Sequence, residues 1–139
     1  MIMDIYMNYN SMRIDHIAIW VNNLEEMKEF YTNYFNLKCG KKYENNKKKF
    51  TSYFLSFDEG ARIEIMKRND ISGITTGKGI SNGFTHLAIS VGSPEKVDEL
   101  TELLRNSGFE IYGEPRTTGD GYYESVILDP EGNHIEISE

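Results

Sequence analysis

The chain has little cysteine, no net positive charge and no long apolar run, and each shortage excludes a class of protein. Its one cysteine, Cys39, excludes an intramolecular disulfide and a cysteine metal cluster, and it favours a cytoplasmic protein. The formal net charge of −7 argues against a nucleic-acid partner, which requires a basic surface. No apolar run approaches the roughly 20 residues of a membrane-spanning helix, so a membrane partner is not expected either.

What the chain does have suits one folded domain. Its 139 residues are 39% hydrophobic and 12% aromatic, which excludes disordered and fibrous classes. Residues 1–12 contain four methionines and show no helical or strand period. We interpret them as a loose N-terminal extension, with Met12 as an alternative start of translation.

A short phrase of sequence occurs twice. HIAIWV, which begins at His16, returns seventy positions later as HLAISV, which begins at His86. Each copy closes on an Ile-Glu-Ile strand, around Glu64 and around Glu136. The interval from histidine to glutamate is 48 residues in the first copy and 50 in the second. The chain is therefore predicted to consist of two related modules.

Hydrophobic patterning predicts the same order of elements in both modules, namely a strand, a helix and three strands. The predicted modules are 13–69 and 83–139, joined by a glycine-rich linker over 70–82. In the first module we expect strands at 14–21, 38–45, 50–57 and 61–68, and a helix capped by Asn23, with Glu26 in capping-box position. In the second we expect strands at 84–91, 109–117, 122–129 and 134–138, and a helix from Ser93 whose buried face is Val97, Leu100, Leu103 and Leu104. Because modules of roughly sixty residues are marginal alone, they should share a core or pair with another chain.

Four polar residues stand at the repeated positions: His16, Glu64, His86 and Glu136. A titrating group in an apolar strand is costly without a partner, although one such residue alone has an ordinary structural explanation. Duplication changes this, because modules related by a pseudo-two-fold axis bring equivalent residues to symmetric places. Two imidazoles and two carboxylates suit a divalent transition metal. Spacing alone leaves a metal site and ordinary strand positions both open.

The chain resembles the vicinal oxygen chelate superfamily, which contains glyoxalase I, bleomycin-resistance proteins and extradiol dioxygenases. The resemblance covers about residues 14–138 and rests on His16-x-Ala-Ile-x-Val, His86-Leu-Ala-Ile-x-Val and Asp129-Pro-Glu-Gly-Asn-x-Ile-Glu136. It implies an α+β fold of two βαβββ modules, whose sheets curve around a metal-lined cleft. The module order derived from patterning agrees with this expectation.

The metal set is most similar to that of glyoxalase I. By this resemblance, His16, Glu64, His86 and Glu136 would hold nickel, cobalt or zinc, with iron and manganese as alternatives. A small oxygen-chelating substrate, such as the hemithioacetal of a 2-oxoaldehyde, would be isomerised by proton transfer between adjacent carbons. Glu136 would carry the proton, with Glu64 opposite it. The resemblance also implies a homodimer.

Several residues bear on the substrate. Glyoxalase I commonly has arginine at the position of Trp20 and asparagine at that of Arg68, so glutathione as cosubstrate is in question. Trp20 could stack on a flat ligand, Arg68 could pair with an acid and Tyr122 could donate a hydrogen bond, but each also suits an ordinary structural role. His134 and Arg62 share a strand face with their glutamates and are weaker candidates for the rim.

Three other interpretations stay open at this stage. The chain could be another enzyme of the superfamily, such as an epimerase, a thiol transferase or a dioxygenase. It could instead be an antibiotic-resistance-type protein that sequesters a ligand without turnover, although four intact ligands argue against that. It could also be a member with an empty site.

Overall fold

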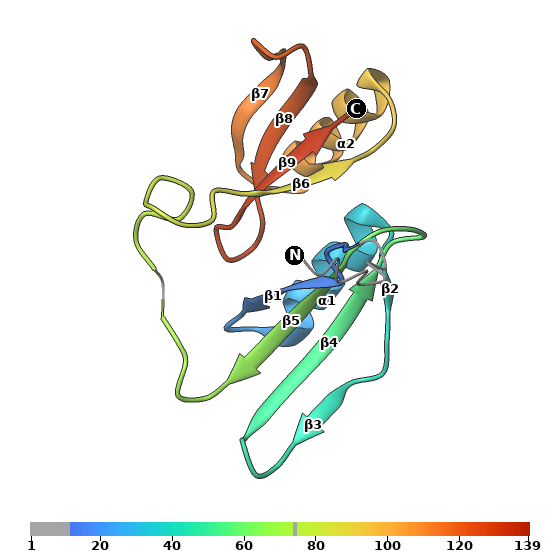
Figure 1. Ribbon diagram of the computed structural model, residues 1–139. Coiled ribbons are helices and arrows are strands. Elements are labelled where there is room, and N and C mark those ends of the chain that lie inside the picture. Colours follow the sequence, from blue (N-terminus) through green and yellow to red (C-terminus); the bar gives the residue numbers. More distant parts are fainter. Residues whose placement is uncertain (1–11, 74) are drawn as a thin grey trace, which may run out of the picture.

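The computed structural model describes residues 12–73 and 75–139, so most of the extension predicted over 1–12 lies outside the described residues. The chain forms two sheets, each with one helix (Figure 1). The first sheet has the strand order β1-β5-β4-β2, with β3 also paired to β4, and the second has the order β6-β9-β8-β7. The fold is α+β, as the sequence predicted.

Each module follows the predicted order of elements. The first contains β1 (His16–Trp20), α1 (Leu24–Phe35), β2 (Lys38–Cys39), β3 (Tyr43–Asn45), β4 (Phe50–Ser56) and β5 (Arg62–Arg68). The second contains β6 (Leu87–Ser90), α2 (Pro94–Asn106), β7 (Ile111–Thr117), β8 (Tyr123–Leu128) and β9 (His134–Ser138). Neither of these helices is long and apolar enough to span a membrane.

Three details differ from the prediction. The strand predicted over 38–45 is divided into β2 and β3, because three residues on that side face only two between Leu55 and Ser52 on β4. His86 lies just before β6 and not within it. On α2, Leu103 is 52% exposed and Thr101 is fully buried, so the buried face of the helix includes Thr101 in place of Leu103.

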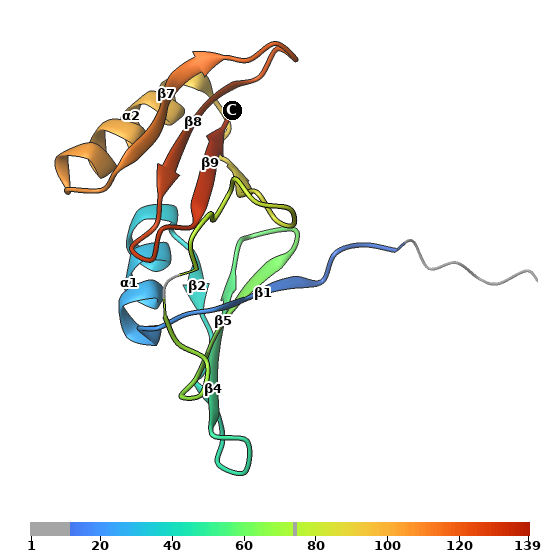
Figure 2. The ribbon, with the colours of Figure 1, turned by 90° about the vertical axis from the view of Figure 1, so that its left-hand side faces the viewer.

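Alternation along the strands gives each sheet one covered face and one open face. Ile63 and Ile65 of β5, and Ile135 and Ile137 of β9, are buried on the face that carries the helices. Both helices lie on the same side of the two sheets (Figure 2). The residues between these isoleucines point to the opposite, open faces. His16, Glu64 and Glu136 belong to these open faces.

The two modules meet on the helix side. The buried apolar residues of both form one cluster, in which the rings of Phe30 and Phe109 are 4.9 Å apart. Buried Tyr31 on α1 donates a hydrogen bond of 2.7 Å from its hydroxyl to Asp129 Oδ2, in the turn before β9. Contacts of this kind fix the second module against the first helix.

The same turn also takes part in capping α1. Asn23 Oδ1 accepts from the Glu26 backbone N–H at 3.0 Å, so the predicted N-cap is confirmed. The reciprocal bond of a capping box would come from the Glu26 side chain. The Asn23 N–H donates to Glu131 Oε2 at 2.9 Å, and the Asn22 N–H donates to Glu131 Oε1 at 2.7 Å. A glutamate of the other module thus occupies the place that sequence proximity assigned to Glu26.

Candidate metal centre

The first histidine and its glutamate lie side by side on the open face of the first sheet. β1 runs parallel to β5 with Ala18 beside Glu64, which puts His16 one step along the same face. His16 Nε2 is 3.7 Å from Glu64 Oε1. The glutamate side chain is largely buried and the imidazole is partly exposed, so a ligand can reach the pair from the open face of the sheet.

The second module repeats this arrangement. β6 runs parallel to β9 with Ala88 beside Glu136, the same register as in the first module. His86 Nε2 is 3.1 Å from Glu136 Oε2. The chain therefore builds two equivalent pairs, which we call the first half-site (His16 and Glu64) and the second half-site (His86 and Glu136).

The geometry of each half-site fits two neighbouring ligands of one ion. Nitrogen and oxygen ligands lie about 2.0–2.2 Å from zinc, which places adjacent donor atoms roughly 3–3.5 Å apart. The separation of 3.1 Å in the second half-site falls within this interval, and that of 3.7 Å in the first lies just above it. Within residues 12–73 and 75–139, however, no three histidine, cysteine, aspartate or glutamate side chains are grouped so as to hold an ion. A centre with all four ligands therefore stays a prediction.

Asp15 is a site residue that the sequence did not reveal. Its Oδ2 accepts from His16 Nδ1 and from Arg62 Nη2, both at 2.8 Å. The hydrogen bond from His16, followed by that from Arg62, lowers the pKa of the Asp15 carboxyl below its usual range. A proton held on Nδ1 leaves the lone pair of Nε2 directed toward Glu64, which is the tautomer a metal ligand needs. The only signal in the sequence is the aspartate directly before the histidine, where the second module has Thr85.

Glu124 is a second residue beside the candidate site that the sequence did not reveal. It lies on β8, and the pairing of Val126 with Glu136 and of Glu124 with Ser138 puts both glutamates on the open face. Glu124 is only 8% exposed. A hydrogen bond shared with Glu136, and then burial, raise the pKa of Glu124 to about 7. The signal in the sequence is its spacing: Glu124 precedes Glu136 by twelve residues, as Ser52 precedes Glu64.

Two of the three predicted substrate-binding residues are neighbours. The guanidinium carbon of Arg68 is 5.3 Å from the centre of the Trp20 ring, at the end of the first half-site's face. Arg68 Nε donates to Asp70 Oδ1 at 2.6 Å, so its charge already has a partner. Trp20 is 40% exposed and could still contact a ligand. Tyr122 lies in the turn between β7 and β8, outside both half-sites.

The two rim candidates are both engaged. Arg62 binds Asp15, and its guanidinium stacks over the Phe54 ring at 4.3 Å. The His134 ring lies 4.4 Å from that of Tyr112. The linker backbone also comes so close to this ring at Gly79 that a Cβ there would lie 2.6 Å from the imidazole. With a φ of +78°, this position requires glycine.

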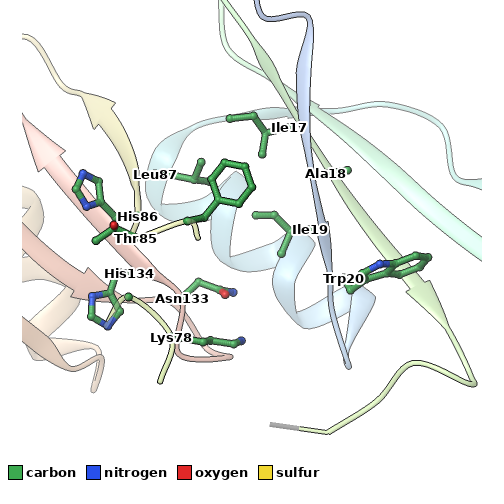
Figure 3. Close-up of a pocket in the computed structure, with 12 residues that line it drawn as sticks. Ile17, Ala18, Ile19, Trp20, Lys78, Thr85, His86, Leu87, Asn133 and His134 are labelled. Atoms are coloured by element: carbon green, nitrogen blue, oxygen red, sulfur yellow. The ribbon is translucent and has the colours of Figure 1, made fainter. Parts of the chain in front are cut away.

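A cavity of about 280 Å³ lies between the edge strands β1 and β6. Figure 3 shows the imidazoles of His86 and His134 on one wall, and Ile17, Ile19 and Trp20 on the other. Of the four predicted ligands only His86 lines it. The cavity therefore marks the junction of the modules and is not a cleft over both half-sites.

Comparison with known proteins identifies the family of the chain. A family model described as the Glyoxalase/Bleomycin resistance protein/Dioxygenase superfamily matches residues 13–137. A lactoylglutathione lyase from Arabidopsis thaliana is 29% identical over 126 residues, which are 90% of this chain and 43% of the relative. A probable lactoylglutathione lyase from Vibrio cholerae is 27% identical over 129 residues, which are 90% of this chain and 88% of the relative.

Solved structures show the same fold. Glyoxalase I from Zea mays superposes with a TM-score of 0.75 at 25% identity, covering 91% of this chain and 44% of that one. A glyoxylase/bleomycin resistance protein/dioxygenase domain from Frankia sp. has a TM-score of 0.77 at 18% identity, covering 92% of this chain and 91% of that one. At this identity the likeness supports the fold and nothing beyond it. The chain spans less than half the length of the plant proteins it matches.

Proposed function

Because the chain belongs to the glyoxalase/bleomycin resistance protein/dioxygenase superfamily, we propose that it is a metal-dependent lyase of the glyoxalase I type. The observation that carries the proposal is the pair of half-sites in equal register, each with a histidine nitrogen 3.1–3.7 Å from a carboxylate oxygen. Two such half-sites supply two neutral and two anionic ligands, which balance a divalent ion. Nickel, cobalt or zinc is the expected metal.

A second copy of the chain is the proposed means of joining the half-sites. β1 and β6, which carry or follow the two histidines, stand at the edges of their sheets. An edge strand offers backbone hydrogen-bonding groups to another chain. In the proposed homodimer the first half-site of one copy faces the second half-site of the other, which gives two four-ligand centres by symmetry.

The chain's own residues would then bind and move a proton. A divalent ion bound by two half-sites would polarise two adjacent oxygens of the substrate and stabilise the negative charge that develops beside them. Glu136 and Glu64 would stand on either side of the reacting carbons, so that one carboxylate removes the proton and returns it to the neighbouring carbon. Asp15 would keep His16 in its ligand tautomer.

The names of the relatives suggest the substrate class. Proteins named lactoylglutathione lyase at 27–29% identity support a hemithioacetal of a 2-oxoaldehyde as candidate substrate. The thiol part is a separate question, because Trp20 stacked with Arg68 replaces the two polar residues that commonly contact glutathione there. Thiols other than glutathione belong in the same assay.

The experiment is metal analysis of the full chain, purified without chelator or affinity tag, together with Glu136→Gln. We expect one divalent ion per chain, loss of that ion in the variant, and a dimer by light scattering. Methylglyoxal mixed with several thiols, followed by absorbance of the thioester product, should then show turnover that chelator abolishes and Ni²⁺ or Co²⁺ restores. The proposal would be wrong if the purified chain held no metal and took up no Ni²⁺, Co²⁺ or Zn²⁺.

A further inference from the structure

Glu124 has a position that the four-ligand centre does not explain. Its pair with Ser138 lies two residue pairs along the strands from the pair of Val126 with Glu136, so Glu124 and Glu136 share the open face of the second sheet. Diagonal neighbours of this kind are within reach of each other's long side chains. Its strand neighbours Ser125 and Ile127 are fully buried on the helix face, so the direction of the Glu124 side chain follows from the strand itself.

The carboxylate of Glu124 has few favourable partners. Among the residues the structure describes, no N–H group and no hydroxyl group donates a hydrogen bond to it, and the one hydrogen bond that it makes is shared with the Glu136 carboxyl. The nearest cation is Arg116, whose Nη2 is 3.9 Å from Glu124 Oε1, and Arg116 is half exposed. Its other neighbour is the carboxyl of Glu136. Two neighbouring carboxyl groups, one of them only 8% exposed, can stay close together in only two ways: they share a proton, or a cation joins them.

The first module supports this interpretation by symmetry. Ser52 pairs with Met66 as Glu124 pairs with Ser138, so it occupies the equivalent position beside Glu64. The Ser52 hydroxyl is the one buried side-chain polar atom without a hydrogen-bond partner among the described residues. Polar groups without partners are rare inside proteins, and this one lies next to the first half-site, at the position equivalent to that of Glu124. The row beside each half-site therefore carries a buried polar residue that the four predicted ligands do not use.

We propose that Glu124 is a further residue of the metal centre, which makes the second half-site doubly acidic and raises its affinity for a divalent cation. The inference rests on the metal centre of the proposed function and adds a residue to it. Glu124 acts from behind the ligands, because no three such side chains converge on one point within the described residues. With serine at the equivalent position, the extra negative charge is confined to the second half-site.

The test is calorimetric titration of the chelator-treated full chain with Co²⁺, comparing Glu124→Gln with Glu99→Gln. Glu99 is an exposed residue of α2, so its variant controls for the change in net charge. We expect Glu124→Gln to weaken Co²⁺ binding roughly tenfold without changing the stoichiometry, in the range known for residues that support metal ligands. Glu99→Gln should stay within about twofold of the wild type, because solvent and salt screen a distant exposed charge.

Two further measurements separate this role from a structural one. Arg116→Gln should tighten Co²⁺ binding by about threefold, since it removes a positive charge beside the same carboxylate. The metal-free Glu124→Gln chain should melt at a higher temperature than the wild type, because the contact between two acids is relieved. A structural glutamate would give a lower melting temperature.

The outcomes distinguish the two proposals. Equal Co²⁺ affinity in Glu124→Gln and Glu99→Gln, with binding abolished in Glu136→Gln, would overturn the role of Glu124 and leave the four-ligand centre intact. A wild-type chain that binds no Co²⁺ would remove both. Should Glu124→Gln fail to fold, unchanged or weaker binding in Arg116→Gln would overturn the role of Glu124 on its own.

Discussion

The two modules share one arrangement of strands and helix but carry different side chains on its open face. In both, an edge strand runs parallel to its neighbour with an alanine beside the glutamate, and a helix covers the opposite face. Beside Glu64 the open face continues with aromatic side chains, since Phe54 pairs with that glutamate and Phe50 lies 6.1 Å from the Trp20 ring. Beside Glu136 it continues with Val126 and acidic Glu124.

This difference shows which parts of a duplicated fold are fixed by geometry. The His–Glu register depends on parallel pairing and on alternation, so both modules reproduce it. The next row along the strands is free to differ, and in the proposed homodimer it would give the two facing half-sites walls of unlike chemistry. One wall, with Trp20, suits an apolar or flat group. The other, with Glu124, suits a cation or a hydrogen-bond donor.

The two helices also carry different side chains at equivalent positions. Substitutions of these residues and their partners are expected to have the largest effect on the free energy of unfolding. Tyr31 on α1 and Thr101 on α2 stand at equivalent positions, seventy residues apart. Tyr31 reaches the other module, where Asp129 also accepts from the Glu131 and Asn133 backbones. Asp129→Ala would leave a buried tyrosine hydroxyl and several turn donors without an acceptor, and should lower the free energy of unfolding by about 3 kcal/mol or more. Urea denaturation of the variant and the wild type measures this loss in the free energy of unfolding.

Tyr31→Phe is the matched control for that prediction. It removes one donor and leaves Asp129 with its other partners, so a loss of about 1 kcal/mol is expected. A loss in Asp129→Ala no greater than in Tyr31→Phe would show that the turn contributes little beyond this one bond.

Thr101 makes its bond within its own module. Its Oγ1 is 2.7 Å from Ser125 Oγ, and both side chains are fully buried. Thr101→Val should cost roughly 1–3 kcal/mol, because the serine hydroxyl loses its partner. Adding Ser125→Ala should recover part of that loss, and a double-mutant cycle by urea denaturation gives the coupling. Additive single effects would mean that the two hydroxyls do not interact.

Much of this shared arrangement was predictable from sequence, because hydrophobic period and sequence repetition can be seen without the folded structure. The order of elements, the N-caps Asn23 and Ser93, and the positions of Glu64 and Glu136 on strands all follow from patterning. The buried face of α2 differs from the prediction because it follows helical period and not hydrophobicity alone. From Val97, helical spacing leads to Thr101 and Leu104, whereas Leu103 lies off this face and is exposed although its side chain is apolar.

Other features needed the folded chain. Glu131 accepts from the N–H groups before α1, although it is more than a hundred residues away and Glu26 stood in the expected place. Asp15 contacts its own neighbour His16 only because it precedes the strand, where alternation does not separate adjacent side chains. The burial of Glu124 depends on the side chains packed over β8. Contacts of these kinds have no period to reveal them.

Glu131 allows a smaller test of the difference between the helices. Its carboxylate accepts from the N–H groups of Asn22 and Asn23, whereas no carboxylate does this before α2 in the described part of the chain. Glu131→Gln should lower the free energy of unfolding by about 1 kcal/mol, more at low salt, since a negative charge at a helix N-terminus is lost. Glu95→Gln in the first turn of α2 is the control, with an expected loss below about 0.5 kcal/mol. Equal losses would mean that the charge from the other module has no special effect.

The smallest effect is expected at Ser52, one of two buried serines on strands β4 and β8 that can be compared directly. Ser125 has a hydrogen-bonded partner, and Ser52 has none among the described residues. Ser125→Ala should cost about 1 kcal/mol, because a made hydrogen bond is lost. Ser52→Ala should be neutral or stabilising by up to about 1 kcal/mol, because it removes a hydroxyl whose desolvation nothing offsets. If Ser52→Ala instead costs as much as Ser125→Ala in urea denaturation, the Ser52 hydroxyl has a partner in solution, and the row beside the first half-site is already satisfied before any ligand binds.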